Sequence, residues 1–354
     1  MSSPTPARPA ATGRPRASQS GPRSGSLPIL ASAVLWGTTG TAASLAPADA
    51  PAAAVGCAGL TLGGILLVLT SRGARSLPAA CTRPDRWRLA LGVAAVAAYP
   101  LTFYPAVART GVAVATVIAL GSAPVFAGLL AWMTGRGRPT ARWSGATTLA
   151  VAGCVLLVLG PAFTAGAAAP VDLAGVALAA GAGLSYAAYS MVGARLITGG
   201  HPSDAVMGVL FGAAGVIVLP IVLSVDTHWL ATTRGAAVAV YLALFTVYLA
   251  YRLFGHGLRR TPASVATSLT LAEPAVAAAL GGAVLGERLP AASWGGLAVL
   301  AAGLFVLAAP LGTARRGRRE SPSAPARRLG RRPRRRAGRM GGDQEAEALD
   351  GGHR

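Results

Sequence analysis

The sequence of 354 residues contains little charge. Only 12% of its residues are charged and 53% are hydrophobic, whereas charged residues make up about a quarter of a typical soluble domain. This shortage excludes an ordinary water-soluble enzyme. The chain also has no lysine, so all 32 of its basic residues are arginine. Without lysine there is no phosphate-binding loop of the Gly-x-x-x-x-Gly-Lys type.

Cysteine and the signatures of common enzymes are also scarce or absent. Three cysteines, Cys57, Cys81 and Cys154, are too few for a disulfide framework, and their spacing matches no metal motif. We interpret them as small apolar packing residues. The sequence lacks the Asp-Asp-x-x-Asp of a prenyl transferase, the His-Glu-x-x-His of a zinc protease and the Gly-x-Ser-x-Gly of a serine hydrolase. We therefore expect no enzymatic activity, no metal and no cofactor.

Long apolar stretches fill the middle of the chain. A helix needs about 20 consecutive apolar residues to cross the bilayer core, and ten such stretches are present, separated by short connections rich in Arg, Asp and Pro. The sequence thus predicts an all-α polytopic membrane protein with ten transmembrane helices. The predicted spans are Leu27–Ala46, Ala50–Thr70, Leu89–Val107, Gly111–Met133, Trp143–Gly160, Val171–Ala194, Ala205–Ser224, Ala236–Tyr251, Ala263–Leu285 and Ala291–Ala309.

The arginines between the spans orient the chain in the membrane. With the N-terminus in the cytoplasm, twelve arginines fall in cytoplasmic connections and three in outer connections, as the positive-inside rule requires. We therefore expect both termini in the cytoplasm and the plasma membrane as the location. The first stretch, followed by Ala48-Asp49-Ala50, also admits an interpretation as a secretory signal. It is longer than the core of roughly 7–15 residues that such signals have.

The two halves of the apolar region repeat each other at an offset of about 150 residues. Each half contains five predicted spans. Because five is odd, the second half enters the membrane from the opposite side. We predict two inverted five-helix repeats, an arrangement typical of secondary transporters, whose substrate site lies near the bilayer midplane between the halves. The aligned pairs are Pro124 with Pro274, Arg109-Thr110 with Arg260-Thr261, Trp143-Ser-Gly145 with Trp294-Gly-Gly296, and Gly153 with Gly303.

Several motifs follow in order along both halves. The first half opens with Leu35-Trp36-Gly37 and the second with Leu184-Ser-Tyr-Ala-Ala-Tyr189. In these motifs, and in those named next, the sequence resembles the EamA-type ten-helix members of the drug/metabolite transporter superfamily over roughly residues 27–309. The clearest region, Leu269 to Leu307, contains Glu273-Pro274, Leu285-Gly-Glu-Arg-Leu289, Trp294-x-Gly296 and Gly303.

The resemblance implies alternating-access transport of a small metabolite, often outward and often coupled to protons or other ions. It implies no particular substrate, because members carry amino acids, nucleobases, sugars and drugs. The sequence departs from the family at one position. The first repeat of the family often ends with an acidic residue after glycine, whereas this chain has Gly135-Arg136-Gly137-Arg138. An arginine must serve a different purpose there.

Among the seven acids between the tails, only Glu273 falls in the centre of a predicted span. A charge at that depth costs about 2.5–3.5 kcal/mol on insertion scales, and intramembrane carboxyl groups commonly relay protons or contact substrates. Proline removes a helix hydrogen bond and frees a carbonyl group, so we predict helix breaks at Pro274 and Pro124. In a structural alternative, protonated Glu273 only hydrogen-bonds a neighbouring helix and holds the bundle together.

Aromatic residues with polar tips lie in several spans. We predict that Trp36, Tyr99, Tyr186 and Tyr248, which lie near mid-depth on different helices, line one aqueous cavity together with Glu273. Helix packing is the alternative for these residues, and it is the interpretation we favour for Tyr104, Tyr241 and Tyr251 near span ends. Tyr241 and Tyr248 are seven residues apart on the eighth predicted span, and we expect them to share a face of it.

The repeats leave two charge-dense tails. We assign residues 27–160 to the first repeat, 171–310 to the second, and 1–26 and 311–354 to disordered basic tails, the latter turning acidic near its end. Beside a cytoplasmic membrane surface, anionic lipids are the expected partners of such arginines, and we expect no nucleic acid. The oligomeric state stays open, with a homodimer as one option.

The sequence therefore favours a secondary transporter that exports a small organic metabolite, such as an amino acid, by alternating access. Its partners are the small-molecule substrate and a coupling ion, with proton coupling through Glu273 as our hypothesis. One alternative is a multidrug-type exporter of hydrophobic cations, which Glu273 among aromatic residues would also suit. An alternative of another class is a non-transporting membrane receptor or scaffold.

Overall fold

The computed structural model describes residues 23–135, 138–164, 172–285 and 290–309. The predicted tails lie outside the described residues, apart from residues 23–26, which belong to the first helix. The described chain is helical throughout, as predicted. Its helices are α1 (Arg23–Gly37), α2 (Thr39–Ala43), α3 (Ala52–Thr70), α4 (Leu77–Ala80), α5 (Arg83–Met133), α6 (Ala141–Thr164), α7 (Leu173–Thr198), α8 (Ser203–Leu223), α9 (His228–Ala231), α10 (Thr233–Tyr241), the π-helix η1 (Leu242–Leu249), α11 (Ala250–Leu258), α12 (Ala263–Leu269), α13 (Ala272–Leu285) and α14 (Ala291–Ala308).

Eight helical stretches of the described chain are long and apolar enough to cross a membrane, two fewer than the ten predicted spans. Two features of the backbone account for the difference. The first predicted span is divided into α1, with 15 residues, and the five-residue α2, and each is shorter than the roughly 20 residues of a crossing. The third and fourth predicted spans are joined in the single helix α5.

Helix α5 contains a joint at Gly111. Its 51 residues correspond to about 77 Å at 1.5 Å per residue, more than twice the bilayer core of about 30 Å. Gly111 has φ 82° and ψ 159°, and it is the non-helical residue inside α5. This positive φ carries a steric penalty for residues with a β-carbon. The joint separates two membrane-length segments without an intervening loop.

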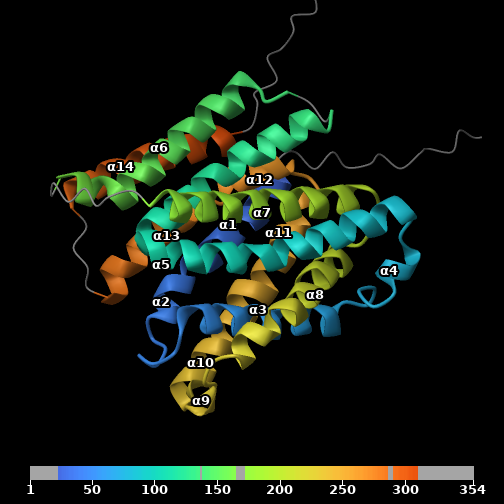
Figure 1. Cartoon of the computed structure of the whole chain (residues 1–354). Helices are drawn as coiled ribbons and strands as arrows, with labels where there is room; N and C mark the ends of the chain where they lie inside the picture. The colour runs from blue at the N-terminus through green and yellow to red at the C-terminus, as the bar shows by residue number, and fades with distance from the viewer. Residues whose placement is uncertain (1–22, 136–137, 165–171, 286–289, 310–354) are drawn as a thin grey trace, which may run out of the picture. The chain divides into compact units, whose positions relative to one another are not determined.

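The helices of the two halves pack against each other in matched pairs. Helix α3 lies against α8 and α6 lies beside α14, while α1 contacts α11 and α13 much as α7 contacts α5 (Figure 1). Within the α6–α14 pair, Gly153 approaches the backbone of Leu300, and Gly303 approaches the backbone of Ala150. The two contacts are related by the repeat offset, so exchanging the helices reproduces them. Such reciprocity is the mark of a two-fold relation.

A second pair of contacts follows the same offset. A β-carbon at Gly25 of α1 would collide with Thr261 and approach Arg260, whereas one at Gly175 of α7 would collide with Thr110 and approach Arg109. These are the Arg-Thr pairs that the sequence repeat aligns. Both contacts require glycine because the neighbouring helix lies too close for a side chain. The repeat therefore governs how the helices pack as well as their order.

Candidate functional site

Glu273 lies just after an interruption between two helices. Helix α12 ends at Leu269, Thr270 and Leu271 form a turn, and α13 begins at Ala272. The turn is closed by the Glu273 amide, which donates to the Thr270 carbonyl at 3.0 Å. Pro274 thus occupies the first turn of α13, where a proline needs no hydrogen-bonded amide. The interruption holds Glu273 at the start of a new helix.

Helix α1 packs directly on this turn. A β-carbon at Gly37 would lie 2.6 Å from Val276 and 2.9 Å from the Glu273 carbonyl oxygen. Glycine at this position therefore allows α1 to approach the first turns of α13. Trp36, the preceding residue, is partly exposed. Its indole Nε1 donates to the carbonyl oxygen of Thr246 at 2.8 Å, which fixes the ring against the π-helix η1.

An aromatic cluster surrounds Trp36. Its ring centroid lies 4.9 Å from that of Tyr251, 5.4 Å from Phe254 and 6.2 Å from Tyr186. Tyr186 also contacts Tyr189, with ring centroids 5.3 Å apart. The cluster joins side chains from α1, α7 and α11. Rings at these separations form favourable tilted or edge-to-face contacts.

Hydrogen bonds tie the cluster to the interruption before Glu273. The Tyr186 hydroxyl lies 2.7 Å from the hydroxyl of Thr270, in the turn between α12 and α13. The hydroxyls of Tyr189 and Tyr251 are 3.1 Å apart. Buried phenols need such partners, and these contacts hold the rings in fixed positions. The turn, the aromatic cluster and Glu273 therefore form one connected group.

The Glu273 carboxylate has no hydrogen-bond or ion-pair partner among the described residues, although its side chain is only partly exposed. An acid that is neither paired nor fully solvated in a membrane protein is a candidate for binding a cation or a proton. The surrounding aromatic faces are suited to organic cations.

The structure thus brings Trp36 and Tyr186 together beside the turn that precedes Glu273. Tyr99 stacks on Phe103, with ring centroids 5.5 Å apart. The Tyr248 ring lies under the guanidinium of Arg252, whose Cζ is 5.6 Å from the ring centroid. Tyr251, expected only to pack near a span end, contacts Trp36 instead. The π-helix η1 ends at Leu249, and its i→i+5 hydrogen bonds turn the following residues away from a regular α-helical face. The local sequence contains no pattern that predicts a π-helix at this position.

Pro124 does not interrupt its helix. Helix α5 keeps helical backbone angles through Pro124, in contrast to the turn that precedes Pro274. A proline removes one hydrogen bond, but neighbouring helices in a membrane bundle can hold the backbone in place. Gly128, one turn later, lies close to the Trp143 ring of α6, and Pro124 itself is buried. Packing on both sides accounts for the unbroken helix.

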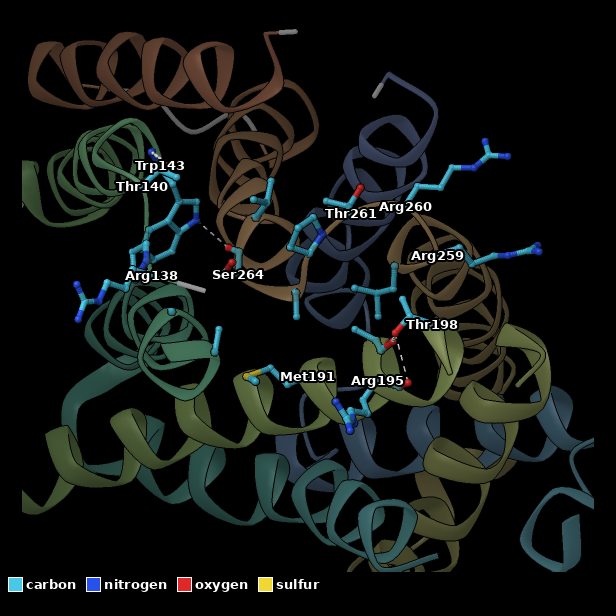
Figure 2. A pocket seen from close by; sticks show the side chains of 18 residues that line it. Arg138, Thr140, Trp143, Met191, Arg195, Thr198, Arg259, Arg260, Thr261 and Ser264 are labelled. Atoms are coloured by element: carbon cyan, nitrogen blue, oxygen red, sulfur yellow. Dashed lines mark hydrogen bonds between the residues drawn. The ribbon is translucent and has the colours of Figure 1, made fainter. Parts of the chain in front are cut away.

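A cavity of about 680 Å³ opens at one end of the bundle, where α5, α6, α7, α11 and α12 meet (Figure 2). We call it the arginine-rimmed cavity, because Arg138, Arg195, Arg259 and Arg260 line it. Figure 2 shows Arg138 on one side of the opening and Arg259 and Arg260 on the other, with Arg195 on the helix between them. Its size falls within the range of small-molecule sites.

The arginine-rimmed cavity ends short of the aromatic cluster. Met191 and Ser264 line it, and they lie five residues beyond Tyr186 and six before Thr270, or about 8–9 Å along their helices. Between the two regions α6 is joined to α12. The Trp143 indole donates to the Ser264 carbonyl at 3.2 Å, and the hydroxyls of Thr147 and Ser268 are 2.9 Å apart.

The opposite end of the bundle carries an ion pair. Arg109 Nε lies 3.1 Å from Asp172 Oδ2, and Asp172 caps α7 by accepting from the Gly175 amide at 3.0 Å. The backbone hydrogen bond from Gly175, together with the charge of Arg109, holds the pKa of Asp172 below its usual value. This pair links the joint region of α5 to the start of α7.

Comparisons with known proteins agree with this architecture. The sequence model of the EamA-like transporter family matches residues 23–159 and 173–309. The uncharacterized transporter YwfM of Bacillus subtilis is 39% identical over 285 residues, which cover 80% of this chain and 93% of YwfM. The threonine/homoserine exporter RhtA of Salmonella typhimurium is 35% identical over 152 residues, 42% of this chain and 48% of RhtA. A protein of known crystal structure has a similar fold, with a TM-score of 0.67 and 20% sequence identity. The superposition covers 80% of this chain and 96% of the chain in that structure.

Proposed function

The chain belongs to the EamA-like transporter family, and from this premise we propose that it exports a small organic metabolite by alternating access. Membership makes it a multi-pass membrane transporter and sets aside the receptor or scaffold alternative. The observation that carries the proposal is the carboxylate of Glu273, which has no partner among the described residues and lies beside an interrupted helix that packs against α1 of the first repeat. Discontinuous helices at a repeat interface are a common way of building a transporter site.

We propose ten membrane crossings in two inverted repeats. In this arrangement α1 and α2 together form the first crossing, and α5 forms two crossings that meet at Gly111. The reciprocal contacts of Gly153 and Gly303 support the proposal. The excess of arginine at one end of the bundle supports a cytoplasmic location for that end and for both termini. The Arg109–Asp172 pair then lies on the outer side.

For the substrate we propose an amino acid or a similar compound. The support comes from RhtA, a threonine/homoserine exporter similar to part of this chain. Glu273 would bind the substrate ammonium group or a coupling proton. Trp36, Tyr99 and Tyr186 would line the site. We add Tyr251 to this set because it contacts Trp36. A variant at Tyr248 will show whether the site extends to that residue.

A second candidate is the export of hydrophobic cations. The position of Trp36, Tyr186 and Tyr251 beside the turn that precedes Glu273 favours it, because aromatic faces attract cations, especially away from water. Both candidates use the same residues and differ in whether the substrate also carries an anionic group.

Metabolite profiling of the growth medium tests the proposal. Cells would express the protein, its Glu273→Gln variant, its Tyr248→Phe variant or an empty vector, and membrane insertion of each protein would be measured in parallel. We expect certain metabolites to accumulate outside only with the unmodified protein and Tyr248→Phe. Equal export by Glu273→Gln would remove Glu273 from the mechanism, and an unchanged medium in every case would contradict export of a cellular metabolite.

A further inference from the structure

The arginine-rimmed cavity has an unbalanced charge. Four arginines and no acid occur among the 18 residues that line it. Within the described part of the chain, none of these arginines forms an ion pair with an acid. All four are exposed, so their guanidinium groups are hydrated and keep their full charge. The lining therefore carries a formal charge of +4, and the side chains of Arg138, Arg259 and Arg260 extend outward from the opening (Figure 2).

Apolar walls below the rim strengthen the effect of this charge. Met191, Leu258 and Val265 line the same cavity. Low-dielectric walls with charges of one sign concentrate the electric field in a cleft, and they raise the local concentration and the association rate of counter-ions by about 10–1000-fold. Exposed charges on an open surface are screened within about 8–10 Å at physiological salt. An ion inside the cavity is screened less than one on the open surface, because the walls exclude part of the solvent.

The other end of the bundle differs in charge. There Arg109, which the repeat aligns with Arg260, is paired with Asp172. The aligned arginine at the cavity has no such partner among the described residues. The two ends have related packing, because Gly25 and Gly175 approach these arginines in the same way. The excess positive charge at the cavity is therefore not required by the repeat.

We propose that the arginine-rimmed cavity is the entrance for substrate and that it selects compounds carrying an anionic group, a carboxylate or a phosphate, over organic cations. This inference rests on the proposed function and narrows it. An amino acid would enter with its carboxylate attracted by the arginines and would then present its ammonium group to Glu273, beyond the Thr147–Ser268 contact. A purely cationic drug would be repelled at the rim.

Cysteine reactivity measures this selectivity without knowledge of the substrate. The three native cysteines, all buried, would be replaced by alanine, and Val265→Cys would place one thiol in the cavity with little change in volume. The probes are two methanethiosulfonates of similar size, one with a sulfonate and one with a trimethylammonium group. Their rates would be divided by their rates with a free thiol in solution. We expect a preference of at least about tenfold for the sulfonate reagent.

Removal of single rim arginines sharpens the test. Arg195→Gln, Arg259→Gln and Arg260→Gln should each lower the preference by about twofold to fivefold, as expected for one charge at about 8 Å in a largely aqueous setting. High salt should lower it further. Arg75→Gln is the matched control, because Arg75 is exposed but does not line the cavity. Equal rates for the two reagents, or an equal effect of Arg75→Gln, would overturn the proposal.

The lipid composition of the vesicles separates a soluble anion from a lipid headgroup. The reactivity would be measured in phosphatidylcholine vesicles with and without phosphatidylglycerol. If the two reaction rates at Val265→Cys are the same with and without phosphatidylglycerol, the result supports an entrance for soluble anions. If phosphatidylglycerol protects the thiol from both reagents, the cavity binds a lipid and the proposal is overturned. Because reactivity does not depend on flux, failure of the export assay alone would refute the proposed function and leave the selectivity measurement intact.

Discussion

The two repeats share their packing contacts but differ at the residues before their aligned prolines. In the first repeat Ala123 precedes Pro124 within a continuous helix, and Ala123 is completely buried. In the second repeat Glu273 precedes Pro274 just after a turn, and Glu273 is partly exposed. The two repeats therefore form a scaffold with two-fold character, whereas the carboxyl group occurs in the second repeat alone at this aligned position.

The largest effects are expected from variants that add a carboxylate to the first repeat or remove it from the second. We expect Ala123→Glu to abolish folding, because the carboxylate would be buried at a position where Gly183 of α7 already approaches the backbone, and an unpaired buried charge costs several kcal/mol or more. The reverse change, Glu273→Ala, should leave a folded protein without transport. Monodispersity in detergent and export flux measure the two effects.

This prediction has a clear counter-result. A monodisperse Ala123→Glu protein would mean that the first repeat tolerates a carboxylate as well as the second. If such a protein also restored flux to Glu273→Ala, the site would be symmetric between the repeats. The two repeats would then not differ in function at this position.

The shared contacts can be tested at Gly153 and Gly303. Alanine at either position places a methyl group against the backbone of the partner helix, so we expect each change to lower stability by about 1–3 kcal/mol, as overpacking does. The two losses should be similar because the contacts are reciprocal. Gly145→Ala is the control, since open space surrounds Gly145. Thermal unfolding in detergent would reveal unequal losses, which would contradict the two-fold relation.

The extent of the site on the second repeat can be sharpened with two tyrosines. Tyr251→Phe removes a hydroxyl that lies 3.1 Å from Tyr189, and a buried hydrogen bond contributes about 0.5–1.5 kcal/mol. We expect it to lower flux by a few fold. Tyr248→Phe keeps the ring under Arg252 and should change flux little. The opposite order in a flux assay would return Tyr248 to the site and exclude Tyr251.

The smallest effect is expected at the ion pair between Arg109 and Asp172. Since Gly175 and Arg109 hold the pKa of Asp172 below its unfolded value, this carboxylate stabilises the fold at neutral pH, and its contribution is lost as the pH falls below about 4. Asp172→Asn keeps the helix cap but removes the charge. The variant should unfold slightly below the parent protein at pH 7.

Measurement of both proteins across pH separates the charge from the cap. The small difference in unfolding temperature at pH 7 should shrink as the pH falls below about 4, because the Asp172 carboxylate of the parent protein is then protonated, in the unfolded state first and at lower pH in the folded state. A difference that grows on acidification would contradict the assigned sign. Asp172→Ala, which also removes the cap, provides a reference for the larger loss.

The sequence predicted much of this structure because lipid imposes simple local requirements. Apolar length located the helices, and the single acid in the centre of a predicted span made Glu273 the candidate site residue, a prediction that still awaits its test. The positions of Tyr248 and Tyr251 were not predictable, because Tyr248 lies within the π-helix η1 and Tyr251 follows it, and a π-helix changes the helical period. The arginine-rimmed cavity was not predicted either. Its lining comes from the ends of five helices that are far apart in the sequence.

The joint at Gly111 has a mechanical consequence. A single non-helical residue connects the two halves of α5, whereas most helix connections have several residues of slack. The backbone torsions of Gly111 therefore set the angle between the two halves. Helix α7 packs against α5. In the proposed transport cycle, a change of this angle would move one half of α5 relative to α7 with no loop to absorb the displacement.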